Sequence, residues 1–188
     1  MTTADLPALA EVVRSTLVER DLEFDASKPG AFLVRLPGTH KLATMTWLVI
    51  GDHSLHVEAF FCRRPDEAHD RFYRWLLARN AKMYAVAFSV DHYGDVYLVG
   101  RLPLSAVEPD ELDRILGSVM TYSDEWFDAA LEIGFRGSIE REWDWRVKRG
   151  ESLANLAAFA RFADPANRAT GADATQTRAS ALRQDVDP

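Results

Sequence analysis

The sequence contains a single cysteine, Cys62, and this scarcity excludes two kinds of structural site. One thiol cannot form an intramolecular disulfide, and it cannot supply a zinc site with several thiolate ligands. The neighbouring Phe60 and Phe61 are typical of a strand end, where a thiol acts as a small apolar side chain. We therefore expect Cys62 to be buried and chemically inert.

An excess of positive charge is also lacking. The chain has 22 Lys and Arg residues against 29 Asp and Glu residues, which gives a formal net charge of −7. Affinity for nucleic acid depends largely on clustered Lys and Arg side chains that neutralise phosphates. We therefore expect no nucleic-acid partner.

Long apolar runs are absent as well. A stretch such as residues 47–50 has the length of a strand and is too short to cross a bilayer. Residues 1–5 contain neither the basic region nor the apolar region of a signal peptide. These features predict a cytoplasmic protein that has no membrane partner.

The apolar residues that are present predict a regular fold. Hydrophobic residues make up 47% of the 188 residues, which is enough for a core. Helical spacing predicts a first helix over residues 6–20, and a short extended piece follows at residues 22–24. Three strands are predicted at residues 31–36, 42–50 and 55–62. Their connections are too short for crossovers, so we expect an antiparallel meander.

A helix, a hairpin and a long helix follow. The second helix begins at Pro65 and ends near Asn80, and the hairpin strands are predicted at residues 82–90 and 96–102. Both faces of the first hairpin strand are apolar, which predicts a central place in the sheet or a place at an interface. The long helix is predicted over residues 109–133.

The remaining residues predict an appendage and a tail. Gly134 is expected to end the long helix, and Gly150 separates two short predicted helices at residues 139–148 and 153–162. The composition then shifts to Ala, Thr, Asp, Arg, Gln and Ser, which is typical of disorder. We expect an α+β protein in three parts: a domain at residues 1–135, an appendage at 136–163 and a disordered tail at 164–188.

No motif for catalysis, phosphate binding or metal binding is present. His53 and His56 point to opposite faces of an extended strand, because their spacing is odd. The loop at residues 91–95 lacks the length and the terminal acidic residue of a calcium-binding loop. The patterns of a serine nucleophile and of a phosphate-binding glycine loop are missing. We assign no catalytic residue, no cofactor and no metal ligand.

Aromatic residues indicate where a partner protein could bind. Trp143 and Trp145 lie close to Arg146 in the sequence, and Trp and Arg are the residue types that anchor interfaces. A second candidate surface combines the apolar stripe of the second helix with the small residues of the next strand: Phe72, Trp75, Leu76, Met83, Ala85 and Ala87. Packing in the core is the alternative explanation for the aromatic residues.

Several stretches resemble actinobacterial proteins of the YbjN domain family: RRPDE at residues 63–67, YRWLL at 73–77, DVYLVGRL at 95–102 and WDWR at 143–146. The order of elements through residue 135 also resembles the type III secretion chaperone-like fold. This resemblance implies a dimeric, non-catalytic protein that binds an extended segment of a partner, with the second helix and the following strand in the dimer. The family label, sensory transduction regulator, names a role without a reaction.

Three functions follow from these observations, in order of preference. The first is a homodimeric, chaperone-like or regulatory module that binds a segment of an unidentified partner protein. The alternative is a small-ligand-sensing regulator with a pocket between the sheet and the long helix, near Tyr122 or Trp126. The third is an enzyme, which would need His56 and Glu58 to meet another histidine, His69 or His92, in one cleft.

Overall fold

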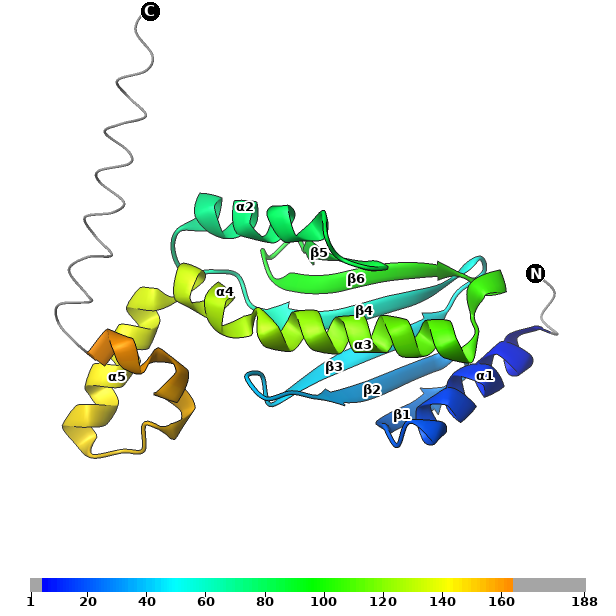
Figure 1. Ribbon diagram of the computed structural model, residues 1–188, viewed down its shortest axis with the longest axis horizontal. Coiled ribbons are helices and arrows are strands. Elements are labelled where there is room, and N and C mark those ends of the chain that lie inside the picture. The colour runs from blue at the N-terminus through cyan, green and yellow to red at the C-terminus, as the bar shows by residue number, and fades with distance from the viewer. Residues whose placement is uncertain (1–4, 164–188) are drawn as a thin grey trace, which may run out of the picture. The chain divides into compact units, whose positions relative to one another are not determined.

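The computed structural model describes residues 5–163, which divide between Gly134 and Phe135 into two compact units. Figure 1 shows the sheet and helices of the first unit, whose elements are α1 (Asp5–Glu19), β1 (Glu23–Lys28), β2 (Ala31–Pro37), β3 (Ala43–Ile50), β4 (Ser54–Cys62), α2 (His69–Asn80), β5 (Val86–Val90), β6 (Val96–Pro103), η1 (Leu104–Ala106), α3 (Pro109–Glu125) and α4 (Phe127–Gly134). The second unit contains α5 (Arg136–Arg149) and η2 (Ala154–Ala163). The expected α+β class is confirmed.

The first unit is built on a six-stranded antiparallel sheet with the strand order β1-β2-β3-β4-β6-β5. Alternate residues of its strands are buried, as the period of two in an extended chain requires. Helices α1 and α3 pack on this buried face (Figure 1). The core between them consists of aliphatic and aromatic side chains that include Val13, Leu17, Phe32, Val34, Leu48, Leu55, Val57, Leu98, Leu112, Ile115 and Val119.

The sheet contains one strand more than the sequence predicts. Residues 23–28 form β1, which pairs antiparallel with β2 and extends the expected three-stranded meander to four strands. Its sequence, EFDASK, is polar and has little strand propensity, so only its first residues appeared extended. Two contacts stabilise the strand in spite of this low propensity. β1 pairs with β2, and Phe24 packs on Phe32 with 6.1 Å between the ring centroids.

The first hairpin strand, predicted at residues 82–90, is shorter than expected. It lies at the edge of the sheet and not at its centre. β5 begins only at Val86, because Ala85 has a left-handed backbone with φ of 59°. Gly100 of β6 permits this bend, since a Cβ there would lie 2.6 Å from the carbonyl oxygen of Ala85. β5 pairs only with β6 and forms an edge of the sheet, so a central position is wrong.

The long helix is divided at Trp126 into α3 and α4, and Gly134 ends α4 as predicted. A Cβ at Gly134 would lie 2.8 Å from Pro65 and 2.9 Å from the ring of Phe72, so this glycine allows α4 to approach the start of α2. In the second unit, Gly150 ends α5 with φ of 68°, as expected. The following helix is 3₁₀ rather than α, and the predicted tail at residues 164–188 lies outside the described residues.

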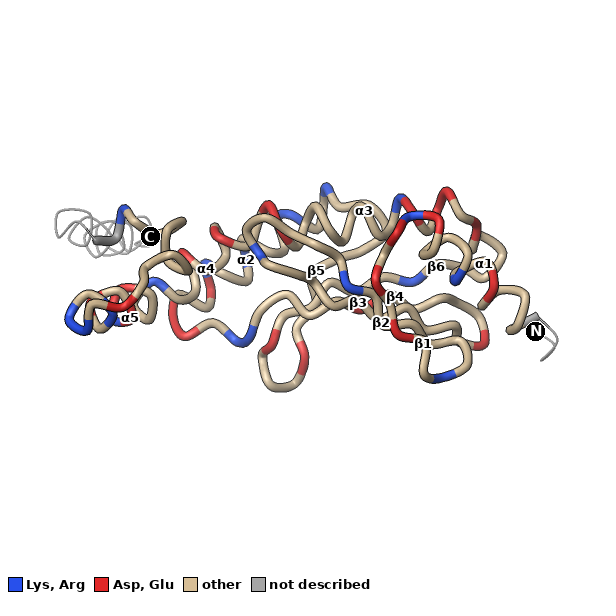
Figure 2. Tube along the Cα trace, turned by 90° about the horizontal axis from the view of Figure 1, so that it is seen from below, with Lys and Arg blue, Asp and Glu red and all other residues tan. Residues whose placement is uncertain are grey.

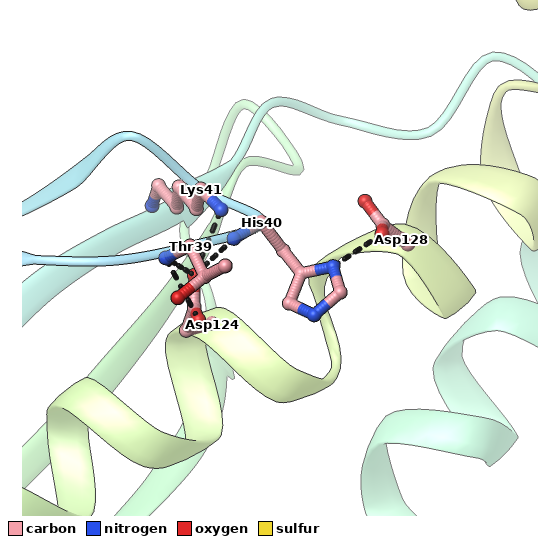
Figure 3. Close-up of polar contacts among 5 residues, drawn as sticks. All are labelled: Thr39, His40, Lys41, Asp124 and Asp128. Atoms are coloured by element: carbon pink, nitrogen blue, oxygen red, sulfur yellow. Dashed lines mark hydrogen bonds and ion pairs between the residues drawn. The ribbon is translucent and has the colours of Figure 1, made fainter. Parts of the chain in front are cut away.

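The loop between β2 and β3 is fastened to the junction of α3 and α4 by two carboxylates (Figure 3). Asp124 accepts hydrogen bonds from the backbone N–H groups of Thr39, His40 and Lys41 at 2.8 to 3.0 Å. Burial raises the pKa of Asp124, but these three hydrogen bonds outweigh it and hold the pKa below its usual value. Nδ1 of His40 lies 2.6 Å from Oδ2 of Asp128.

The side chain of Lys41 turns from this loop toward the end of β4. Its ammonium group donates hydrogen bonds to the carbonyl oxygens of Phe60 and Phe61 and lies 5.5 Å from the ring centroid of Phe127. Burial lowers the pKa of Lys41 to about 8. The neighbouring Cys62 is buried, and burial raises the pKa of its thiol to about 12, so it has the inert character that was expected.

Replacing Asp124 with alanine should destabilise the first unit by about 2 kcal/mol, because three backbone N–H groups would lose a charged acceptor. Chemical denaturation monitored by circular dichroism would measure the loss. The adjacent Glu125 is exposed and serves as a matched control, since Glu125→Ala should change the unfolding free energy by less than about 0.5 kcal/mol. Equal stability of the two variants would contradict this role of Asp124.

The contact between His40 and Asp128 should respond to pH. The hydrogen bond and the charge of Asp128 raise the pKa of His40 above its ordinary value of 6.5. Its contribution to loop docking is therefore fully present below pH 6.5 and is lost as the pH rises through the folded-state pKa. Asp128→Asn should lower the pKa of His40 in an NMR titration, and Glu125→Gln, which removes a weaker influence, should lower it less. An unchanged titration in Asp128→Asn would contradict the assignment.

Candidate functional site

Helix α2 directs the predicted surface residues to different places. Phe72 and Leu76 point inward and are buried in the core of the first unit, and of these two only Leu76 also lines the groove described below. Trp75 is half-buried on the side of α2 that faces the junction of α3 and α4. Leu77 points outward and keeps 65% of its surface exposed. The most exposed apolar side chain of the helix is therefore one that the sequence analysis did not select.

An aromatic stack holds α2 against the junction of α3 and α4. The guanidinium carbon of Arg79 lies 3.3 Å from the ring centroid of Trp75 and 5.4 Å from that of Trp126. Trp126 in turn stacks on Tyr122, at 4.8 Å between centroids and an interplanar angle of 11°. Burial lowers the pKa of Arg79, and its Nε has no hydrogen-bond partner among the described residues. Tyr122 and Trp126, which were expected beside a ligand pocket, thus pack against other side chains.

The residues before β5 are tied to α3. The backbone N–H of Tyr84 donates to the hydroxyl of Tyr122 at 3.0 Å, and the hydroxyl of Tyr84 donates to Glu111 at 2.6 Å. This attachment places Met83, which is half-buried, and Ala85, which is exposed, beside the end of α2 rather than on a strand. Ala87 does lie on β5 and is half-buried.

The outer edge of β5 is closed by a side chain of α2. Oδ1 of Asn80 accepts a hydrogen bond from the backbone N–H of Phe88 at 2.8 Å, and Nδ2 of Asn80 donates to the carbonyl oxygen of Phe88 at 3.2 Å. The carboxamide therefore occupies the two groups through which Phe88 would pair with another strand. A partner strand cannot be added at Phe88 unless Asn80 moves away.

An apolar groove lies between α2 and β5 next to this contact. It has a volume of about 120 Å³ and is lined by Tyr73, Leu76, Leu77, Phe88 and Val90. The volume is several times the share of about 30 Å³ that one water molecule takes in the liquid, so an aliphatic side chain can enter. Leu77 stands at the rim of this groove, which gives the same surface a projecting residue and a receiving hollow.

Another candidate surface, different from the two that the sequence predicts, is the face of the sheet that α1 and α3 leave uncovered. Met45, Trp47 and Val49 of β3 and Phe60 of β4 alternate with buried residues, and each keeps between 39% and 43% of its surface exposed. The strand register places Leu33 opposite Trp47, Val49 opposite His56 and Phe60 opposite Tyr97. The rings of Phe60 and Tyr97 touch edge to face at 5.5 Å between centroids. Met45, Trp47, Val49 and Phe60 thus form an apolar patch with Leu33 and Tyr97, and His56 and Glu58 of β4 lie on the same face.

This patch was not predicted, although its signal is present in the sequence. In β4, Leu55, Val57, Ala59 and Phe61 are buried, and His56, Glu58 and Phe60 alternate with them on the other face. The same alternation in β3 sets Met45, Trp47 and Val49 on one face, and a tryptophan on an otherwise outward face is the clue. Which face the helices would cover could not be derived from either strand alone.

The remaining predicted residues belong to the second unit. Trp145 on α5 is 42% exposed and has the guanidinium carbon of Arg149 4.7 Å from its ring centroid. Trp143 is half-buried. Nε of Arg146 bonds to Glu142 at 2.6 Å, and Nη1 of Arg146 donates to the carbonyl oxygen of Ser152 at 2.9 Å, which ties α5 to the segment after it.

The described residues contain no group of three or more His, Cys, Asp or Glu side chains that could hold a metal ion. Of the histidines considered for an enzyme, His69 lies beside Tyr73 on α2 and His92 lies against Tyr93 in the β5–β6 turn.

Figure 2 shows acidic and basic residues interspersed along the trace. In the part of the chain that the structure covers, no helix combines the length and the apolarity of a membrane span.

Comparison with known proteins identifies relatives over most of the chain. The model of the family YbjN, described as "Putative bacterial sensory transduction regulator", matches residues 9–132. An uncharacterized protein of Mycobacterium bovis is 49% identical over 163 residues, which cover 84% of this chain and 89% of the relative. An uncharacterized protein of Mycobacterium leprae is 53% identical over 132 residues, covering 70% of this chain and 72% of the relative.

Among the solved structures with a similar chain is the heterodimeric ExoU–SpcU complex from the type III secretion system of Pseudomonas aeruginosa. Its TM-score is 0.45 at 14% identity, and the match covers 58% of this chain and 89% of that chain. The family match includes the whole sheet and most of the helices that cover it, and it contains both the α2 groove and the apolar sheet face. The chain therefore belongs to the YbjN family.

Proposed function

We propose that this protein is a non-catalytic, chaperone-like or regulatory module of the cytoplasm that works as a homodimer and holds a segment of a partner protein. The observation that carries this proposal is the apolar patch on the uncovered face of the sheet. Antiparallel sheets that have one face in solvent usually carry polar residues there. Here Met45, Trp47, Val49 and Phe60 occupy that face together, and large exposed apolar patches mark interaction sites.

The partner segment lies across the sheet face in this proposal. Addition of a strand to β5 would be the other common way to bind an extended segment, but Asn80 already pairs with Phe88 at that edge. Trp47 lies at the centre of the patch, with Leu33 opposite it on β2 and Glu58 opposite it on β4. A Trp anchor with a carboxylate beside it suits an apolar segment that also carries a basic or N–H donor group.

The dimer forms through the outer face of α2. A twofold contact brings the same surface of both copies together, so a projecting residue on one copy must meet a hollow on the other. Leu77 and the groove lined by Tyr73, Phe88 and Val90 satisfy this condition on one surface. The predicted residues Met83 and Ala85, which follow the end of α2, enlarge the contact in this proposal, whereas Trp75 supports α2 from its inner side. A dimer of ordinary size would bury about 1,200–2,000 Å² in total.

The second unit adds a smaller contact in this proposal. Trp145 is exposed on α5, and Arg149 and Arg146 lie on the same helix. Exposed Trp and Arg side chains in one place are typical anchors for a partner. Trp143 is half-buried on the same helix.

The dimer is tested by Leu77→Glu, which should give a monomer in size-exclusion chromatography with light scattering, because two carboxylates would be buried against apolar side chains. Leu42→Glu makes the same change at a leucine that is 83% exposed in the β2–β3 loop, and it should leave the dimer intact. A wild-type protein that is monomeric at tens of micromolar would reject the dimer, and a dimeric Leu77→Glu would reject this interface.

The partner site is tested by comparing Trp47→Ser with Val18→Ser, which removes an equally apolar, 63% exposed residue from α1. Each tagged variant is purified from the native cytosol, and the bound proteins are quantified by mass spectrometry. A partner that binds stoichiometrically to the wild type and to Val18→Ser should be reduced about tenfold or more with Trp47→Ser. Identical recovery with all three proteins would show that the sheet face does not hold the partner.

A further inference from the structure

A second cavity, separate from the groove and the sheet face discussed above, lies between α1 and the β1–β2 hairpin. Its volume is about 450 Å³, which falls in the range of sites for small organic ligands. It is lined by residues from the first half of α1, from the end of β1, from the turn and from the start of β2: Leu6, Pro7, Ala10, Arg14, Ala26, Ser27, Lys28, Pro29, Gly30 and Phe32.

Most of the lining is apolar, and the turn that closes it is fixed. Phe32 is almost completely buried at the base of the cavity. Gly30 has φ of 70°, and a Cβ there would lie 3.0 Å from Cδ1 of Leu6, so the turn approaches α1 closely because this position has no side chain. Leu6, Ala10 and Phe32 give the cavity a hydrocarbon lining that water solvates poorly.

Two exposed cationic side chains also line the cavity, Arg14 from α1 and Lys28 from the end of β1. The guanidinium carbon of Arg14 lies 5.9 Å from the ring centroid of Phe24 and 5.7 Å from that of Phe32, so the aromatic rings hold the group in place. Neither cation forms an ion pair with any carboxylate that the structure describes.

Ser27 is the other polar residue of the lining, and its hydroxyl donates to the carboxylate of Asp25 at 2.5 and 2.7 Å. Asp25 itself does not line the cavity. The cavity therefore presents two positive charges above apolar walls, on a chain whose formal net charge is −7. A cleft lined by charges of one sign raises the local concentration of the opposite ion, which here is an anion.

We propose that this cavity binds a single-chain amphiphilic anion, with its carboxylate or phosphate between Arg14 and Lys28 and its hydrocarbon chain against Leu6, Ala10 and Phe32. Arginine pairs with a carboxylate or a phosphate through two parallel N–H donors, and a hydrocarbon chain fills the space that a polar ligand would leave poorly packed. Such an anion can occur free in solution or as part of a lipid surface. This inference does not depend on the proposed protein-binding function.

Binding is measured by isothermal titration calorimetry and by NMR shifts of the cavity residues, with decanoate and decyl phosphate below their micelle-forming concentrations as probes. The wild type should bind both anions and should bind decanol at least about tenfold more weakly, because decanol lacks the charge. Arg14→Gln and Lys28→Gln should each weaken decanoate binding about tenfold or more. Arg101→Gln removes an exposed cation from the sheet face and should leave the affinity unchanged.

Ala10→Phe tests the cavity without removing a charge, since its ring would fill the space for the hydrocarbon chain. This variant should lose binding, while circular dichroism shows an intact fold.

Vesicles of phosphatidylglycerol form a separate arm of the experiment. Binding to vesicles without binding to free decanoate would overturn the proposal, because a surface rather than the cavity would then hold the lipid. The proposal also fails if decanol binds as tightly as decanoate, or if Arg14→Gln and Lys28→Gln bind like the wild type.

Discussion

The first unit depends on the way a single layer of helices covers a broad antiparallel sheet. α1 and α3 provide that layer, and their buried stripes, with Val13, Leu17, Leu112 and Ile115, account for the core on one face. None of the described residues of this unit forms a second layer over the other face, so the residues on that face remain partly exposed. Because those residues in β3, and Phe60 in β4, are large and apolar, the covering of one face determines where the proposed partner site lies.

α2 is not part of that layer, and it has a different role in the structure. It is held at one end of the sheet by the stack of Trp75, Arg79 and Trp126 and by the pairing of Asn80 with Phe88. These contacts protect the edge of β5 from uncontrolled strand addition. They also fix the orientation of the helix, so that Leu77 points outward beside an apolar groove. One set of contacts thus closes the edge at Phe88 and sets the orientation of α2 on which the proposed dimer rests.

The carboxylate contacts of the β2–β3 loop serve the sheet face in a similar way. Asp124 accepts hydrogen bonds from three backbone N–H groups of the loop. Gly38 lets the loop come close to Asp124, because a Cβ at this position would lie 2.5 Å from Oδ1 of Asp124. The loop connects β2 to β3, which carries Met45, Trp47 and Val49. Its attachment to α3 therefore fixes the strand that contributes most of the apolar patch. The half-buried Lys41 donates to the carbonyl oxygens of Phe60 and Phe61 near the end of β4.

The sequence by itself determined the elements whose signals are local. The alternation in β4, the stops at Gly134 and Gly150 and the α+β class follow from spacing and from the conformational freedom of glycine, and they need no knowledge of distant residues. The family could also be inferred, because it rests on short stretches of sequence.

The tertiary structure decided the features that depend on contacts between residues far apart in the sequence. β1 is a strand because β2 pairs with it, β5 starts late because Ala85 bends over Gly100, and Phe72 is core because α4 ends against it. The exposure of Trp47 and the cavity that Arg14 lines also depend on tertiary packing. Only packing determines which face of a strand the helices cover and where two elements leave space between them.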